Sequence, residues 1–284
     1  MSKLITVIDG SVYSTSVCEH AAWIANRAGS HVDIVHVLGR RDPSSDEANL
    51  SGSIGLGARS ALLSELSELD AQRARLAQKR GRAILDDAES LLKERGVSEV
   101  HSRLRHGEIV ETVAEIEADA DLLVLGKRGE GADFDKGHLG SNLERVVRSS
   151  HKPVLVASRS FKPINRVLIA FDGGKSSLKA IEFFAGRAHY NDLACHVLFV
   201  GSDTAEHRRQ VEGAVATLSK GGFTATGDIV SGQPETVITE QVDANGYDLV
   251  IMGAYGHSRI RSLIIGSTTT EMMRSCKVPV LLFR

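Results

Sequence analysis

Glycines and hydroxyl side chains in the last part of the sequence have the spacing of a phosphate-binding loop. Gly253 and Gly256 follow the apolar run 248–252, and Gly266-Ser267-Thr268 comes after nine further residues. Glycine allows the tight turns and the close approach to a ligand that such a loop needs. The start of a helix presents unpaired N–H groups and a partial positive charge, which suit a phosphate. We therefore infer a candidate nucleotide site; ordinary turns and helix caps are the alternative interpretation of the same residues.

The same order of motifs occurs twice along the chain. A short apolar strand pattern ends at Asp9-Gly10 and again at Asp172-Gly173. A first glycine pair stands at Gly126-x-x-Gly129, and a closing Pro-Val-Leu begins at residue 153 and again at residue 279. The first copy is longer, in a polar loop and a long helix. Two copies are too few for a solenoid, so the chain is a tandem duplication.

Each copy alternates strand and helix patterns, which places the motifs on a sheet. This order is typical of a doubly wound parallel sheet with right-handed crossovers. Ligands of such sheets bind outside the carboxyl ends of the strands, near the switch point. Asp9 and Asp172 close the first strand of each copy, and the glycine loops follow the fourth. Both elements are therefore expected at the same crevice.

A leucine stripe in the first copy predicts a long amphipathic helix. Leu62, Leu66, Leu69 and Leu76 recur at helical spacing, and a second apolar run follows Gly81. The pattern indicates one long helix, or two with a bend at the glycine. The leucines could form a surface for a partner, but we favour a helix packed on its own sheet.

Composition and charge exclude several classes of protein. The 34 Lys and Arg residues balance 36 Asp and Glu residues, so no general attraction to nucleic acid or to a membrane surface is expected. The three cysteines, Cys18, Cys195 and Cys276, have no metal-ligand spacing and indicate reduced thiols. The first residues do not form a signal peptide, and no apolar run reaches the length of a membrane span. These features predict a soluble, cytoplasmic protein.

The glycine spacing, the Asp-Gly strand ends and the Pro-Val-Leu closing strands together resemble the universal stress protein family, in a tandem arrangement over essentially the whole chain. The resemblance implies an α/β fold of two tandem Rossmann-like domains, similar to adenine nucleotide alpha hydrolases. Each would be an open five-stranded parallel sheet with helices on both faces. We expect the first domain at residues 1–158 and the second, with the intact glycine motif, at residues 159–284.

In ATP-binding members of the family, the first-strand aspartate and the backbone at the end of the second strand hold adenine and ribose. The glycine loop and the hydroxyls after its last glycine hold the phosphates, and the implied ligand is ATP, with or without Mg²⁺. The positions that match in the second half are Asp172, Val200, Met252, Gly253, Gly256, Gly266, Ser267, Thr268 and Thr269. Those in the first half are Asp9, Val37, Gly126, Gly129, Gly140 and Ser141.

The first copy departs from the family pattern in its glycine loop. Ten residues rather than nine precede Gly140, and they include Glu130, Asp133 and Asp135. Carboxylates near a polyphosphate oppose its binding unless a divalent ion bridges them. The second loop carries Arg259 and Arg261 instead, which suit a phosphate better. We favour a degenerate first loop and expect ATP to be held tightly only by the second half.

The closing strands predict how the halves meet. Residues 153–157 and 279–283 are apolar edge candidates, and such an edge is a liability unless it is paired or covered. Single-domain members of the family dimerise through this strand, so the resemblance implies an intramolecular pseudo-dimer. A homodimer is the further partner that we consider.

The preferred function is an ATP-binding stress-response regulatory protein that uses the nucleotide as a conformational signal. Neither a P-loop nor a Gly-x-Gly-x-x-Gly motif nor a serine elbow is present. We therefore name no catalytic residue and no metal ligand, and expect at most weak ATPase activity. An adenylating or phosphoryl-transfer enzyme on the same fold is the first alternative. The second is a binding module for another small molecule or a protein partner.

Overall fold

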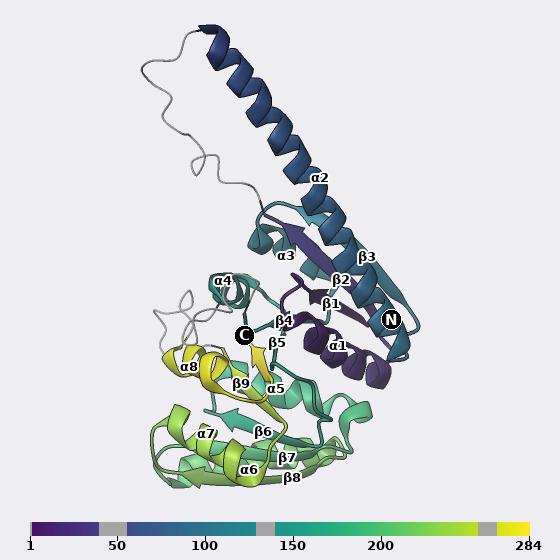
Figure 1. Ribbon diagram of the computed structural model, residues 1–284. Helices are drawn as coiled ribbons and strands as arrows, with labels where there is room; N and C mark the ends of the chain where they lie inside the picture. Colours follow the sequence, from purple (N-terminus) through teal and green to yellow (C-terminus); the bar gives the residue numbers. More distant parts are fainter. Residues whose placement is uncertain (1, 40–55, 129–139, 255–265) are drawn as a thin grey trace.

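The computed structural model describes residues 2–39, 56–128, 140–254 and 266–284, with only the backbone at residues 56–61 and 141. Figure 1 shows strands and helices alternating along this chain. The first half contains β1 (Lys3–Val7), α1 (Ser14–Ala28), β2 (His31–Leu38), α2 (Leu56–Glu94), β3 (Val100–His106), α3 (Ile109–Ile116), β4 (Leu122–Gly126), α4 (Ser141–Ser149) and β5 (Val154–Ala157). The second half contains β6 (Arg166–Phe171), α5 (Lys175–Ala185), β7 (Ala194–Val200), α6 (Ala205–Lys220), β8 (Thr224–Val230), α7 (Pro234–Asn245), β9 (Leu249–Gly253), α8 (Ser267–Ser275) and β10 (Val280–Phe283).

The strands form one ten-stranded sheet in the order β3-β2-β1-β4-β5-β10-β9-β6-β7-β8. All pairs within a half are parallel. The two halves have the same strand order, but it runs in opposite directions along the sheet, so that their fifth strands meet in the middle. Strands β1, β4, β6 and β9 are near-continuous apolar runs because helices cover both of their faces. The edge strands β3 and β8 are more exposed. The predicted α/β fold with two tandem five-stranded parallel halves is confirmed, and the two halves are joined into one mixed sheet.

The halves meet where β5 pairs with β10, the only antiparallel pair among the described strands. Leu281 of β10 lies opposite Leu155 of β5, and both side chains are buried. Pro153 and Pro279 stand just before the two strands, and their carbonyls accept hydrogen bonds from β4 and β9. The closing strands therefore cover each other's edges, as the apolar pattern of residues 153–157 and 279–283 predicted.

Two apolar cores lie on opposite faces of the sheet. One gathers buried residues of α1, α2, α5 and α6. The other gathers buried residues of α3, α4, α7 and α8. In each half the first two helices therefore cover one face and the last two cover the other. The change of face falls beside the first strand of each half, β1 or β6, which fixes the switch point.

Helix α2 is one continuous helix, and the packing expected for its leucine stripe is wrong over the first part of it. Leu66, Leu69 and Leu76 are 44%, 45% and 64% exposed, whereas Leu85 and Leu92 are buried against the sheet. The reason is length. At 1.5 Å per residue a helix of 39 residues is about 58 Å long, whereas the eight residues of β2 cover about 26 Å. Figure 1 shows the N-terminal part of α2 projecting beyond the sheet.

Gly81 marks the point at which α2 reaches the sheet, and it has a packing role rather than the suggested bend. A Cβ atom there would lie 2.7 Å from Leu104 Cδ1 and 3.0 Å from His36 Cδ2. Both of those side chains belong to strands, β3 and β2. A glycine at this position therefore lets the helix backbone lie close against the two strands.

Candidate functional site

The structure brings the predicted second-half residues to neighbouring strand ends. Asp172 directly follows β6, Val200 ends β7 and Gly253 ends β9. Strand β6 lies between β9 and β7 in the sheet, so these three positions share its carboxyl edge. Met252 is buried in β9, and it can therefore offer a ligand only its backbone. Val37, one residue before the end of β2, occupies the first-half position that corresponds to Val200.

Both first-strand aspartates form the same turn. Asp172 Oδ1 accepts hydrogen bonds from Gly174 N at 2.9 Å and from Ser177 Oγ at 2.6 Å. Asp9 Oδ1 accepts one from Ser11 N at 3.0 Å. The glycine that follows each aspartate has a positive φ, of +79° in the first half and +73° in the second, which favours glycine. One carboxylate oxygen of each aspartate thus fixes the turn at the strand end.

The first glycine of each loop gives room to a helix. A Cβ at Gly253 would lie 3.0 Å from Ser176 Cβ, at the start of α5. A Cβ at Gly126 would lie 2.8 Å from Tyr13 Cβ, just before α1. Neither glycine has a positive φ. Their absence of a side chain is thus explained by the approach of α1 and α5, whether or not a ligand also needs the space.

Helix α8 begins at the same edge and is tied to the end of β9. Gly266 N donates to Ala254 O at 3.3 Å, and Thr269 Oγ1 donates to Gly253 O at 3.2 Å. In the first half Gly140 N donates in the same way to Lys127 O at 3.4 Å. Helix geometry leaves the N–H groups of the first turn without partners inside the helix. In α8 these belong to Ser267, Thr268 and Thr269, and they start from the edge where Asp172 lies.

The hydroxyls of this turn have different surroundings. Ser267 is exposed, whereas Thr269 is buried with its hydroxyl directed at the loop carbonyls. Thr268 Oγ1 lies 3.4 Å from a carboxylate oxygen of Glu235 in α7. Thr269 therefore holds the loop in position, and Ser267 is the more accessible group. Gly129, Gly256 and the charged loop residues Glu130, Asp133, Asp135, Arg259 and Arg261 lie outside the described residues, as does the side chain of Ser141.

Two of the described differences between the halves bear on anion binding. The buried side chain of Tyr13 stands in the first half where the second half has Ser176, each against the first glycine of its loop. The first turn of α4 also contains Glu144, whereas the first turn of α8 contains no acidic residue. A carboxylate at a helix N-terminus competes with a bound anion for the same positive end.

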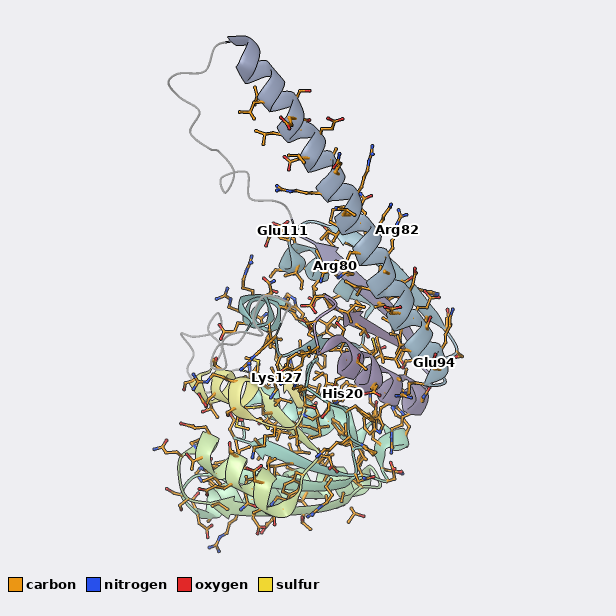
Figure 2. The ribbon with its side chains drawn as sticks, in the orientation of Figure 1. His20, Arg80, Arg82, Glu94, Glu111 and Lys127 are labelled. Atoms are coloured by element: carbon orange, nitrogen blue, oxygen red, sulfur yellow. The ribbon has the colours of Figure 1, made fainter. Side chains whose placement is uncertain are left out.

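Two cations that connect the halves were missed by the sequence analysis. Lys127 follows β4, is buried, and its Nζ donates to Cys276 O at the C-terminal end of α8. Arg284 follows β10, and its Nη1 donates to Arg148 O at 3.2 Å at the end of α4. Each cation therefore meets the partial negative charge of the other half's last helix. Figure 2 labels Lys127 beside α8. The only signal in the sequence was a lysine where the second half has Ala254.

Burial lowers the pKa of Lys127 below its ordinary value of 10.5. The folded protein therefore releases this proton at a lower pH than the unfolded chain, so stability rises with pH between the two pKa values. Lys127→Met removes the titration. We expect the unfolding free energy of the parent protein to rise relative to that of the variant as the pH approaches 10.5, measured by urea denaturation at a series of pH values. Parallel pH profiles would contradict the buried position of this ammonium.

The described residues contain neither a group of three or more His, Cys, Asp or Glu side chains that could hold a metal ion nor a helix long and apolar enough to span a bilayer. All three cysteines are buried and unpaired. Burial raises the pKa of the Cys18 and Cys195 thiols to about 12, so neither is a thiolate at neutral pH.

Comparison with known proteins decides the family. The model of the universal stress protein family matches residues 1–158 and 201–284. The chain belongs to the universal stress protein family. Universal stress protein Slr1230 of Synechocystis is 36% identical over 287 residues, covering all of both chains.

This universal stress protein also has the fold of solved members. The crystal structure of a universal stress protein from Archaeoglobus fulgidus matches with a TM-score of 0.70 at 16% identity, over 99% of this chain and 96% of that one. A universal stress protein solved in complex with cAMP matches 43% of this chain and 98% of its own, at 22% identity and a TM-score of 0.38. The first match, at 16% identity, shows a shared fold and no more.

Proposed function

We propose that this universal stress protein binds ATP, with or without Mg²⁺, in its second half and uses the nucleotide as a conformational signal in a stress response. One arrangement carries the proposal. The N-cap of helix α8, Gly266, is hydrogen-bonded to Ala254 directly after β9. Strand β9 pairs with β6, and Asp172 directly follows β6. Backbone donors and a carboxylate thus meet at the carboxyl edge of a parallel sheet, where nucleotides bind.

Each matched residue receives a role that its surroundings allow. Asp172 and the backbone at Val200 would hold ribose and adenine, and the backbone of Met252 and Gly253 would border the ligand. Gly256 and Gly266, with the N–H groups and hydroxyls of Ser267 and Thr268, would hold the phosphates. Thr269 would act by holding the loop, because its hydroxyl donates to Gly253 O. The first-half counterparts Asp9, Val37, Gly126, Gly129, Gly140 and Ser141 would form a second, weaker site.

Gly266→Val tests the binding proposal directly. Gly266 has φ −61° and ψ 146°, which valine can adopt, and the nearest atom to an added Cβ is Thr269 Oγ1 at 3.6 Å. The fold should therefore persist, while the side chain fills the approach to the first turn of α8. We expect calorimetry to show ATP binding weakened by about 100-fold or more.

Gly140→Val is the matched control, because Gly140 is the N-cap of α4 with a similar backbone conformation. It should leave the tight site unchanged. Unchanged ATP affinity in Gly266→Val, with an unfolding curve like that of the parent, would refute the assignment to α8.

We expect the two sites to be unequal. Tyr13 against Gly126 and Glu144 in the first turn of α4 both oppose a nucleotide in the first half. An unscreened carboxylate about 4 Å from a phosphate costs about 4 kcal/mol at an effective dielectric of 20, and nearby cations and salt reduce this. A difference of about one to two decades in affinity follows. Titration should saturate near one ATP per chain, and two equivalent sites would show that these groups do not face the ligand.

The connection between the halves supports a signalling role. The N-terminal end of α8 would receive the phosphates. At the opposite end of this helix, the Cys276 carbonyl accepts a hydrogen bond from Lys127 Nζ of the first half. A displacement of α8 on nucleotide binding would therefore reach the first half. We propose that residues 1–158 and 159–284 act as an intramolecular pseudo-dimer in the cytoplasm, with little or no hydrolysis. Phosphate release well below one ATP per minute would agree with this; rapid turnover would not.

A further inference from the structure

The projecting part of α2, residues 62–80, is a helical segment with leucine side chains that the described residues leave uncovered. Four of the six large apolar side chains that are exposed in the described structure lie on it, Leu63, Leu66, Leu69 and Leu76. Figure 2 shows this part of the helix extending away from the body, with Arg80 near its base. Concentration of exposed leucines on one free segment indicates a binding surface rather than scattered surface residues.

The spacing of these leucines is that of a helix pair. Leu62, Leu66, Leu69 and Leu76 follow alternating steps of four and three residues, with Arg73 at the one interrupted position. A seam of this period keeps facing a second helix that is wound around it. A helix that packed on a sheet would show the broader apolar face of the C-terminal part of α2, where Leu85, Ala88 and Leu92 are buried.

The distribution of charge along the segment indicates which helix would pair with it. The first part carries only acids, Glu65, Glu68 and Asp70, and the last part carries only bases, Arg73, Arg75, Lys79 and Arg80. Asp70 and Arg73 lie 3.9 Å apart within the helix, but both are exposed, so water screens this pair. Two copies in parallel would place like charges side by side. Two copies in antiparallel orientation would place the acids of each beside the bases of the other.

We propose that residues 62–80 of α2 pair with the same residues of a second copy of this chain. The two helices run antiparallel, with Ala71 of one copy opposite Ala71 of the other. In that register Leu66 faces Leu76 of the second copy and Glu65 lies near its Lys79. The pairing surface lies on the projecting helix of the first half rather than at the second-half strand ends where tight ATP binding is proposed, and it does not depend on that function. The alternative binding partner is an anionic membrane surface. The acidic side chains between the leucines would be repelled by anionic lipid, which argues against it.

Charge reversal tests the pairing in the full-length chain. We expect the parent protein to be a dimer at micromolar concentration in sedimentation experiments at low salt. Glu65→Lys with Glu68→Lys leaves Asp70 as the only acid of the segment, which becomes largely basic, and should weaken dimerisation at least tenfold. Arg75→Glu with Lys79→Glu makes it largely acidic and should have the same effect. Mixing the two variants should restore a dimer, because each supplies the charge that the other lacks.

Control variants separate pairing from folding and from other contacts. Asp86→Lys with Asp87→Lys reverses two exposed charges on the sheet-packed part of α2 and should leave the dimer intact. Leu66→Cys mixed with Leu76→Cys should give a disulfide between the two variants under mild oxidation, since the native cysteines are buried.

Three outcomes would overturn the proposal. The first is a parent protein that remains monomeric at about 100 μM. The second is preferential cross-linking of Leu66→Cys to itself, which indicates a parallel pair. The third is binding of the monomer to vesicles of anionic lipid that Leu66→Glu abolishes.

Discussion

Leu281→Asp should destabilise the protein by about 4 kcal/mol or more, because it places a carboxylate inside the join between the halves. Leu281 is buried in β10 with Leu155 of β5 opposite it on one side and Ile251 of β9 on the other. Neither neighbour can donate a hydrogen bond to the new side chain. Urea denaturation followed by circular dichroism measures the loss.

Leu281→Met is the control for this position, because it keeps the volume and the apolar character and should cost less than about 1.5 kcal/mol. If Leu281→Asp unfolds with a free energy within about 1 kcal/mol of the parent, then the β5–β10 contact is not part of the folded core.

Gly126→Val is expected to cost about 3 kcal/mol, through overlap rather than through lost burial. The added Cβ would stand 2.8 Å from Tyr13 Cβ. A Cβ is fixed to the backbone, so a change of side-chain rotamer cannot relieve this contact, and α1 would have to move away from β4. Gly266→Val provides the comparison, since it meets no atom closer than 3.6 Å and should cost less than about 1 kcal/mol.

A second substitution tests the cause. Tyr13→Gly removes the opposing Cβ, so the double variant with Gly126→Val should be less destabilised than the two single effects added together. Strict additivity in thermal or urea unfolding would show that the valine is harmful for some other reason than contact with Tyr13.

The sequence was sufficient for the fold because its signals are local and repeated. Buried parallel strands are continuous apolar runs, and Asp-Gly turns, glycine loops and closing Pro-Val-Leu motifs occur in the same order twice. Their positions on neighbouring strand ends follow from the doubly wound topology. The edges of the two closing strands were recognised for a related reason, since an apolar edge has to be covered.

Features that depend on distant neighbours were not predictable. The spacing of Leu66, Leu69 and Leu76 defines an apolar helix face, but the local sequence does not show that the sheet ends before it reaches these leucines. The role of Gly126 depends on how closely α1 approaches β4, and that of Thr269 on which carbonyl its hydroxyl meets. Lys127 meets α8 only because β5 and β10 run side by side.

The position of β10 has a consequence for synthesis of the chain. It follows every other strand in order, yet it lies in the middle of the sheet, between β5 and β9. A nascent chain that has folded its first half therefore exposes the unpaired edge of β5 until β10 leaves the ribosome. During that interval the edge can capture a strand from a neighbouring chain. Ribosome pausing between β5 and β10 should thus increase co-translational aggregation, whereas pausing after β10 should not.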